Sequence, residues 1–167
     1  SPTFASKGWR LNINGKYLVP VIKMEDGSRM GNSIVVRADL DGSIALGKKL
    51  SMKLGATVGT SLNGNEPPLS YRFFVGGQSH MKYFDNIISF DGLKFTQLYG
   101  DHIALAKISW QYNIYKNIYA IANFNGGYVS DNYNEWLTDD SYVFGCGLTL
   151  GMNTMAGPIE VSLMGSN

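Results

Sequence analysis

Few residues in this sequence have the type and spacing that catalysis or metal binding requires. The two histidines, His80 and His102, stand at opposite ends of a long segment that also contains three aspartates, but the spacing matches no known pattern of metal ligands. A second acidic group, between Asp131 and Asp140, lacks the regular spacing of oxygen ligands in a calcium site. The Gly-x-Ser-x-Gly turn that carries a hydrolase nucleophile does not occur. The sequence therefore predicts no catalytic residue, no metal site and no cofactor in this chain.

The only cysteine, Cys146, excludes an internal disulfide and any cysteine-based metal cluster. In the predicted strand over residues 142–152, Cys146 lies between glycines and shares the apolar face with Phe144 and Leu148. A buried or lipid-facing thiol is therefore a better interpretation than a nucleophile.

The composition is unusual for a water-soluble domain. Charged residues make up 16% of the 167 residues, against about 25% in typical soluble domains, while aromatic residues reach 13% and there are 20 glycines. The formal net charge of +1 gives no indication of a nucleic-acid partner. No apolar run approaches the ~18 residues of a membrane helix. These features together favour a membrane β-barrel, in which apolar and polar side chains alternate.

Strict alternation along the chain predicts eight strands, because a period of two puts each set of side chains on one face. Short polar turns and longer polar breaks separate them, as in an antiparallel up-and-down barrel. The predicted strands cover residues 9–19, 34–46, 50–62, 71–75, 104–112, 118–128, 142–152 and 159–163.

The two faces of these strands differ in polarity. One face is expected to meet lipid and carries Leu40, Leu54, Ile108, Phe124, Leu148 and Val161. The other is expected to face a wet lumen and carries Arg37, Asp39, Lys53 and Asn123. A soluble β-sandwich also alternates. Aromatic residues near the strand ends favour the barrel, where they would form interfacial girdles: Trp9, Tyr17, Tyr112, Tyr115, Tyr119, Tyr128 and Tyr142.

The connection over residues 77–101 is too long for a hairpin and too apolar for a free surface loop. We predict that it folds into the lumen and buries Phe84, Ile88, Phe90 and Phe95 against the wall, with Lys82 or Lys94 reaching Asp39 or Asp41. The alternative is a small helical or strand insertion packed on the barrel rim.

Two motifs resemble the BamA/TamA-like assembly-barrel superfamily. The first is the strand end Phe73-Phe74-Val75-Gly76-Gly77, followed by the long connection, and the second is the Gly157-Pro158 turn before an alternating strand. The resemblance implies a sixteen-stranded barrel, of which 1–167 would be one incomplete domain lacking the N-terminal half and the closing strand. The Arg-Gly tip usual in that superfamily's long loop does not occur here.

Residues 84–95 and 103–119 are similar to the barrels of Bacteroidetes patatin-like phospholipases. This resemblance implies a bacterial outer-membrane module that anchors a patatin-like phospholipase, with a part in its translocation as an extension. The lipase site would lie outside this sequence. Its partners would be the lipid bilayer, its own N-terminal domain and the missing strands. The alternatives are an assembly or translocation barrel without a lipase, and a stand-alone eight-stranded surface barrel.

Overall fold

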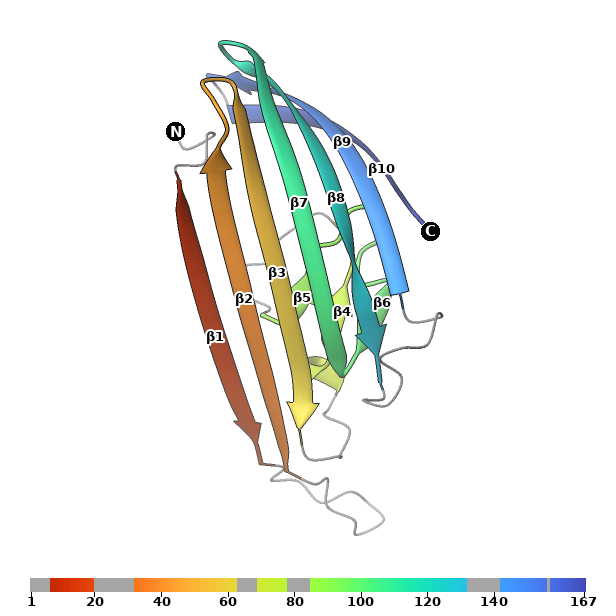
Figure 1. Ribbon diagram of the computed structural model, residues 1–167. Helices are drawn as coiled ribbons and strands as arrows, with labels where there is room; N and C mark the ends of the chain where they lie inside the picture. The colour runs from red at the N-terminus through yellow and green to blue at the C-terminus, as the bar shows by residue number, and fades with distance from the viewer. Residues whose placement is uncertain (1–6, 20–31, 63–68, 78–84, 132–141, 156) are drawn as a thin grey trace.

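The computed structural model describes residues 7–19, 32–62, 69–77, 85–131, 142–155 and 157–167. Its main feature is one antiparallel sheet of seven long strands, here called the wall, in the order β1-β2-β3-β7-β8-β9-β10 (Figure 1). The wall strands are β1 (Gly8–Leu18), β2 (Ser33–Ala45), β3 (Leu50–Leu62), β7 (His102–Tyr115), β8 (Ile118–Ser130), β9 (Tyr142–Thr154) and β10 (Gly157–Ser166). The prediction of an all-β antiparallel fold is confirmed.

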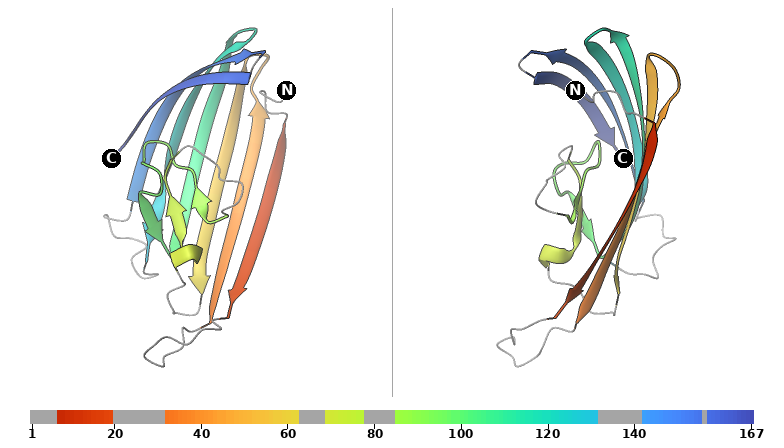
Figure 2. Two further views of the ribbon diagram at one scale, coloured as in Figure 1. Left: turned by 180° about the vertical axis from the view of Figure 1, so that it is seen from behind. Right: turned by 90° about the vertical axis from the view of Figure 1, so that its left-hand side faces the viewer.

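A second, smaller sheet lies against the concave face of the wall (Figure 2). It has the order β5-β4-β6 and contains β4 (Phe73–Val75), β5 (Ile87–Ile88) and β6 (Leu98–Gly100), preceded by the 3-10 helix η1 (Leu69–Tyr71). Residues 69–77 and 85–101, which contain this sheet, are called the inner segment below.

The predicted fourth wall strand, 71–75, is wrong. These residues do form a strand, β4, but β3 pairs directly with β7 and β4 belongs to the small sheet. The reason is length and burial. At three residues β4 cannot span a bilayer, and Phe73 and Val75 are both fully buried between the inner segment and the wall.

The two faces of the wall have the predicted polarity. Residues paired across neighbouring strands form rows of side chains that point to the same face. One such row, on the convex face, consists of Leu11, Leu40 and Ala56 of β1, β2 and β3. Leu148, Val161 and many similar side chains are more than half exposed there, and Cys146 is exposed among them. No second sheet covers this face in the described part of the chain. The soluble sandwich is therefore the weaker interpretation.

The aromatic side chains of this face gather near both strand ends. Trp9, Trp110, Tyr112 and Tyr115 lie toward one end, and Tyr17 and Tyr142 toward the other. Tyr128 was predicted in the girdle but is only 3% exposed and packs edge-on against Tyr142. Tyr119 was predicted in the same girdle but is buried and donates a hydrogen bond to Glu160 Oε1 (2.6 Å), because its position in β8 falls on the inward side of the alternation.

The connections differ between the two ends of the wall. At one end, here the short-turn end, β2–β3, β7–β8 and β9–β10 are joined by residues 46–49, 116–117 and 155–156. At the other, the long-connection end, residues 19–32, 63–101 and 131–141 join the strands. Membrane barrels of bacteria show this same asymmetry.

Within the described residues the wall is open: β1 pairs only with β2, and β10 only with β9. The sheet curves around the inner segment without closing (Figure 2). Among these residues we find no helix with the length and apolar character needed to cross a membrane.

Candidate functional site

An apolar core joins the inner segment to the wall near the long-connection end. The wall contributes inward-facing side chains of β2, β7 and β9, and the inner segment contributes its own large side chains: Val35, Ile103, Leu105 and Val143 from the wall, and Phe73, Val75, Ile88, Phe90 and Leu93 from the segment. At about 1.5–3 kcal/mol for each large apolar side chain removed from water, this core supplies the main stabilisation of the segment.

The four apolar residues predicted to anchor the long connection have different environments. Ile88 and Phe90 are buried, at 7% and 1% exposure. Phe84 lies outside the described residues. The predicted burial of Phe95 is wrong: its side chain is 50% exposed and lies beside the backbone of Gly77.

The family-motif residues shape the turn at the end of β4. Phe73 points at the wall, where a Cβ on Gly59 would fall 2.5 Å from its Cζ, while Phe74 tilts against Tyr99. Gly76 and Gly77 have φ of 136° and 78°, values that L side chains rarely adopt.

The second family motif, at the start of β10, also has a special backbone. Gly157 has φ of 130° and pairs with Thr154, and Pro158 follows it at the edge of the sheet. The glycines of both motifs therefore occupy backbone conformations that favour glycine.

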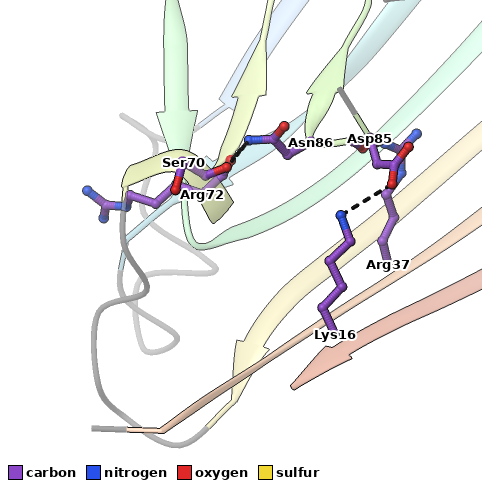
Figure 3. A network of polar contacts seen from close by, with 6 residues as sticks. All are labelled: Lys16, Arg37, Ser70, Arg72, Asp85 and Asn86. Carbon is purple, nitrogen blue, oxygen red and sulfur yellow. Dashed lines mark hydrogen bonds and ion pairs between the residues drawn. The ribbon is translucent and has the colours of Figure 1, made fainter. Parts of the chain in front are cut away.

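Basic residues of β1 and β2 hold one side of the inner segment (Figure 3). Lys16 Nζ lies 3.2 Å from Asp85 Oδ2, and the Arg37 guanidinium donates to the Asp85 carbonyl. Arg37 also pairs with Asp39 at 2.7 Å, and Thr57 donates to the same carboxylate. The Asn86 amide donates to the carbonyls of Ser70 and Arg72, which ties the two described stretches of the segment together.

Arg72 fixes the base of the segment to the wall. Its Nε lies 2.6 Å from Asp101 Oδ1 and its Nη2 lies 2.8 Å from Asp131 Oδ1, just beyond β8. The same guanidinium stacks over the Tyr99 ring, 5.3 Å from its centroid.

A third set of contacts lies at residues 90–92, called the tip. Lys107 Nζ of β7 lies 2.7 Å from Asp91 Oδ2, and Asn125 of β8 donates to the Asp91 carbonyl at 3.0 Å. Asp91 is almost fully buried. Its Oδ2 has no well-aligned hydrogen bond. The contact with Lys107 is therefore an ion pair defined by the short distance between the two charges.

The ion pairs of the inner segment differ from the one predicted for Lys94, and the prediction for Lys82 stays untested. We expected Lys82 or Lys94 of the connection to reach Asp39 or Asp41 of the wall. Lys82 lies outside the described residues, and Lys94 forms no ion pair within them. In the pairs Lys16–Asp85 and Lys107–Asp91 the segment supplies the carboxylate and the wall supplies the cation, whereas Arg72 is a cation of the segment itself. Arg37 of the same strand pairs with Asp39, so the charge of that carboxylate is already neutralised.

Beyond the tip, toward the short-turn end, the concave face lines an open cavity of about 950 Å³. Its lining is rich in charged side chains, including Arg10, Asp41, Lys53 and Glu160. Ser89, Phe90 and Asp91 of the inner segment close the cavity on the side of the long-connection end. The described residues contain no cluster of three potential metal ligands. The arrangement is suited to enclosing a wet space and obstructing one end of it.

Comparison with known proteins identifies the family. The family model of the OMP85 superfamily matches residues 1–166. The chain belongs to the OMP85 superfamily. No curated protein matches it significantly.

Membership in the OMP85 superfamily assigns meaning to the two faces of the wall. Proteins of this superfamily are β-barrels of the outer membrane and are generally not enzymes, which places the chain in the bacterial outer membrane at the level of the family. In an outer-membrane barrel an apolar outer face meets lipid and a polar inner face lines the lumen, and the convex and concave faces of this wall have these two characters.

Sequence reasoning missed the polar contacts of the inner segment. Asp85 and Asp91 belong to the three aspartates between the two histidines, and Lys16 and Lys107 lie in the alternating segments, but the pattern assigns no partner to any of them. The signal that could have identified them was present: acidic residues in a segment expected inside the lumen, opposite basic residues at inward positions of the strands.

Proposed function

We propose that this chain forms about half of the wall of a sixteen-stranded outer-membrane barrel that assembles or translocates proteins, and that the inner segment obstructs its lumen. The observation that carries the proposal is the seating of the inner segment on the concave face, with its own apolar core and two ion pairs to the wall.

The position of the obstruction gives the proposed lumen a direction. The apolar core occupies the long-connection half, which by the asymmetry of bacterial barrels faces outward. The charged cavity occupies the short-turn half, which then opens to the periplasm. A polar polypeptide would therefore enter the cavity from the periplasm, and the inner segment would block its further passage.

Loss of the protein from cells tests this function. We expect specific cargo proteins to disappear from the outer membrane or the cell exterior and to accumulate in the periplasm, as measured by quantitative proteomics of the fractions. Complementation with the wild-type gene should restore them. Fractions that stay unchanged in the deletion strain would refute a role in assembly or translocation.

A narrower version is that the barrel anchors and helps to translocate a patatin-like phospholipase domain of the same polypeptide. The similarity of residues 84–95 and 103–119 to barrels of that branch favours it. A Gly-x-Ser-x-Gly domain upstream in the gene product would support this version, and periplasmic repeat domains alone would favour assembly without a lipase. The stand-alone eight-stranded barrel loses its basis, since one of the eight predicted strands belongs to the inner segment.

A further inference from the structure

Two short turns of the wall carry exposed lysines at the short-turn end. Lys48 and Lys49 lie in the β2–β3 turn, and Lys116 lies in the β7–β8 turn. The two turns are far apart in sequence but adjacent in space, because β3 pairs directly with β7 and the Asn113 amide donates a hydrogen bond to the Lys49 carbonyl (2.7 Å). They lie next to each other at the upper end of the wall in Figure 1. The fold thus brings the three lysines into one surface patch, called the basic turn patch below.

The positive charge of the basic turn patch is not neutralised by the described part of the chain. None of its lysines takes part in an ion pair among the described residues. The short turns at 46–49, 116–117 and 155–156 contain no Asp or Glu in the sequence. Among the described strands, the carboxylate nearest this end in the register is that of Glu160, which lines the cavity on the concave side and accepts a hydrogen bond from Tyr119 (2.6 Å).

Basic residues near the opposite end of the wall have a different environment. Lys16 pairs with Asp85, and Arg72 pairs with Asp101 and Asp131. These cations serve contacts within the protein. The lysines of the basic turn patch have no such contact among the described residues, so charge complementarity favours an anionic partner outside the protein.

Exposed aromatic residues lie beside the basic turn patch on the convex face. Tyr112 and Tyr115 stand at the end of β7, and Trp110 precedes them and packs edge-on against Phe124, with ring centroids 5.5 Å apart. Tyr and Trp side chains on the outer face of a membrane protein lie at the level of the lipid head groups. A lysine side chain can lay its apolar stem along such a surface and place its ammonium group among the phosphates. The patch therefore lies at head-group level, and by its short turns on the periplasmic side.

We propose that the basic turn patch binds the head groups of anionic phospholipids in the periplasmic leaflet and anchors the β3–β7 part of the wall there. The ligand class is a phosphodiester head group with net negative charge, as in phosphatidylglycerol. The inference rests on membership in an outer-membrane barrel family and on the two turns, and it is independent of any cargo. An anionic membrane surface attracts each nearby lysine with a gain of roughly fivefold in affinity, so one lysine in full contact is enough for a measurable preference.

Quenching of Trp110 fluorescence by brominated lipids measures this preference beside the patch. Trp110 is 37% exposed on the convex face, and in the test protein it is the only tryptophan, the others being replaced by phenylalanine. The full-length protein is refolded into phosphatidylcholine vesicles that contain rising fractions of brominated phosphatidylglycerol or, for comparison, of brominated phosphatidylcholine. The two quenching curves give the relative affinity of the two lipids for this place. We expect phosphatidylglycerol to be favoured by about fivefold or more, and high salt to reduce the preference because it screens exposed charges.

Charge variants show whether the lysines cause the preference. Lys48→Gln/Lys49→Gln/Lys116→Gln should abolish it, and Lys48→Arg/Lys49→Arg/Lys116→Arg should keep it, because arginine retains the positive charge. All three side chains are exposed, so these substitutions remove no buried contact. The matched control is Lys53→Gln, which also removes a lysine without an ion pair among the described residues, but one that lines the lumen cavity. This control should leave the preference at Trp110 unchanged.

A reporter at the other end of the wall controls for a general affinity of the barrel for anionic lipid. Tyr142→Trp, combined with Trp110→Phe, puts the only tryptophan at an exposed position near the long-connection end, where no preference is expected. Three results would overturn the proposal. Equal quenching by the two lipids at Trp110 would leave an acidic protein surface as the occupant of the patch. A preference that survives the triple glutamine substitution, or one that is equally strong at position 142, would separate lipid binding from these lysines.

Discussion

Two aspartates of the inner segment each face a wall lysine, but their surroundings differ. Asp85 is 61% exposed beside Lys16, whereas Asp91 is 3% exposed beside Lys107. Exposed ion pairs contribute about 0–1 kcal/mol, because water screens the charges and ordering two long side chains costs entropy. A carboxylate left alone in a buried place loses more, because water does not replace its partner.

This difference predicts an order of stabilities. Lys107→Gln should lower the free energy of unfolding by roughly 1–3 kcal/mol, and Lys16→Gln by less than about 1 kcal/mol. Urea titration of the protein in lipid bilayers measures both. Lys53, which lines the same cavity and forms no ion pair within the described residues, gives the control Lys53→Gln. Equal losses for Lys16 and Lys107 would show that Asp91 is not buried as described.

At the scale of the strands, the alternation predicts which substitutions the membrane rejects. Leu54 of β3 is on the convex face in a row with Ile108 and Phe124, and its neighbour Lys53 lines the lumen cavity. Leu54→Arg should cost about 2–4 kcal/mol near the bilayer midplane, whereas Lys53→Arg should be nearly neutral. Refolding yield into liposomes and urea titration measure both. A neutral Leu54→Arg would mean that this face does not meet lipid.

Alternation was sufficient to predict the long strands and the side of most of their residues, because a wall with an apolar and a polar face imposes a period of two over many residues. It could not predict the partner of β4. Phe73, Phe74 and Val75 are apolar on both sides of the strand, so the pattern contained no information on which sheet they join. Only the contacts with Gly59 and the apolar core, which are remote in sequence, decide that.

The site was less predictable than the fold for a similar reason. The apolar content of residues 77–101 was enough to predict an inward fold and the burial of Ile88 and Phe90. The exposure of Phe95 depends on its place beside Gly77, a contact remote in sequence that its apolar character does not reveal. The direction of the ion pairs depends on Arg37 pairing with Asp39 within its own strand, which spacing alone does not reveal.

At the scale of the whole molecule, the account depends on the inner segment lying within the lumen and closing it from outside. Ser89 lies on the segment beside Phe90 and faces the cavity that opens to the short-turn end. Val19, just past β1 at the long-connection end, is 57% exposed. The two positions should therefore differ in the side from which water-borne reagents reach them.

Thiol labelling of intact cells measures this difference with little perturbation, because Ser89→Cys is nearly isosteric. In a Cys146→Ser background, a bulky membrane-impermeant maleimide added outside should label Val19→Cys rapidly and leave Ser89→Cys unlabelled. A small thiol reagent given access to the periplasm should then label Ser89→Cys. If Ser89→Cys reacts from outside as fast as Val19→Cys, the inner segment does not close the lumen and the central claim is wrong.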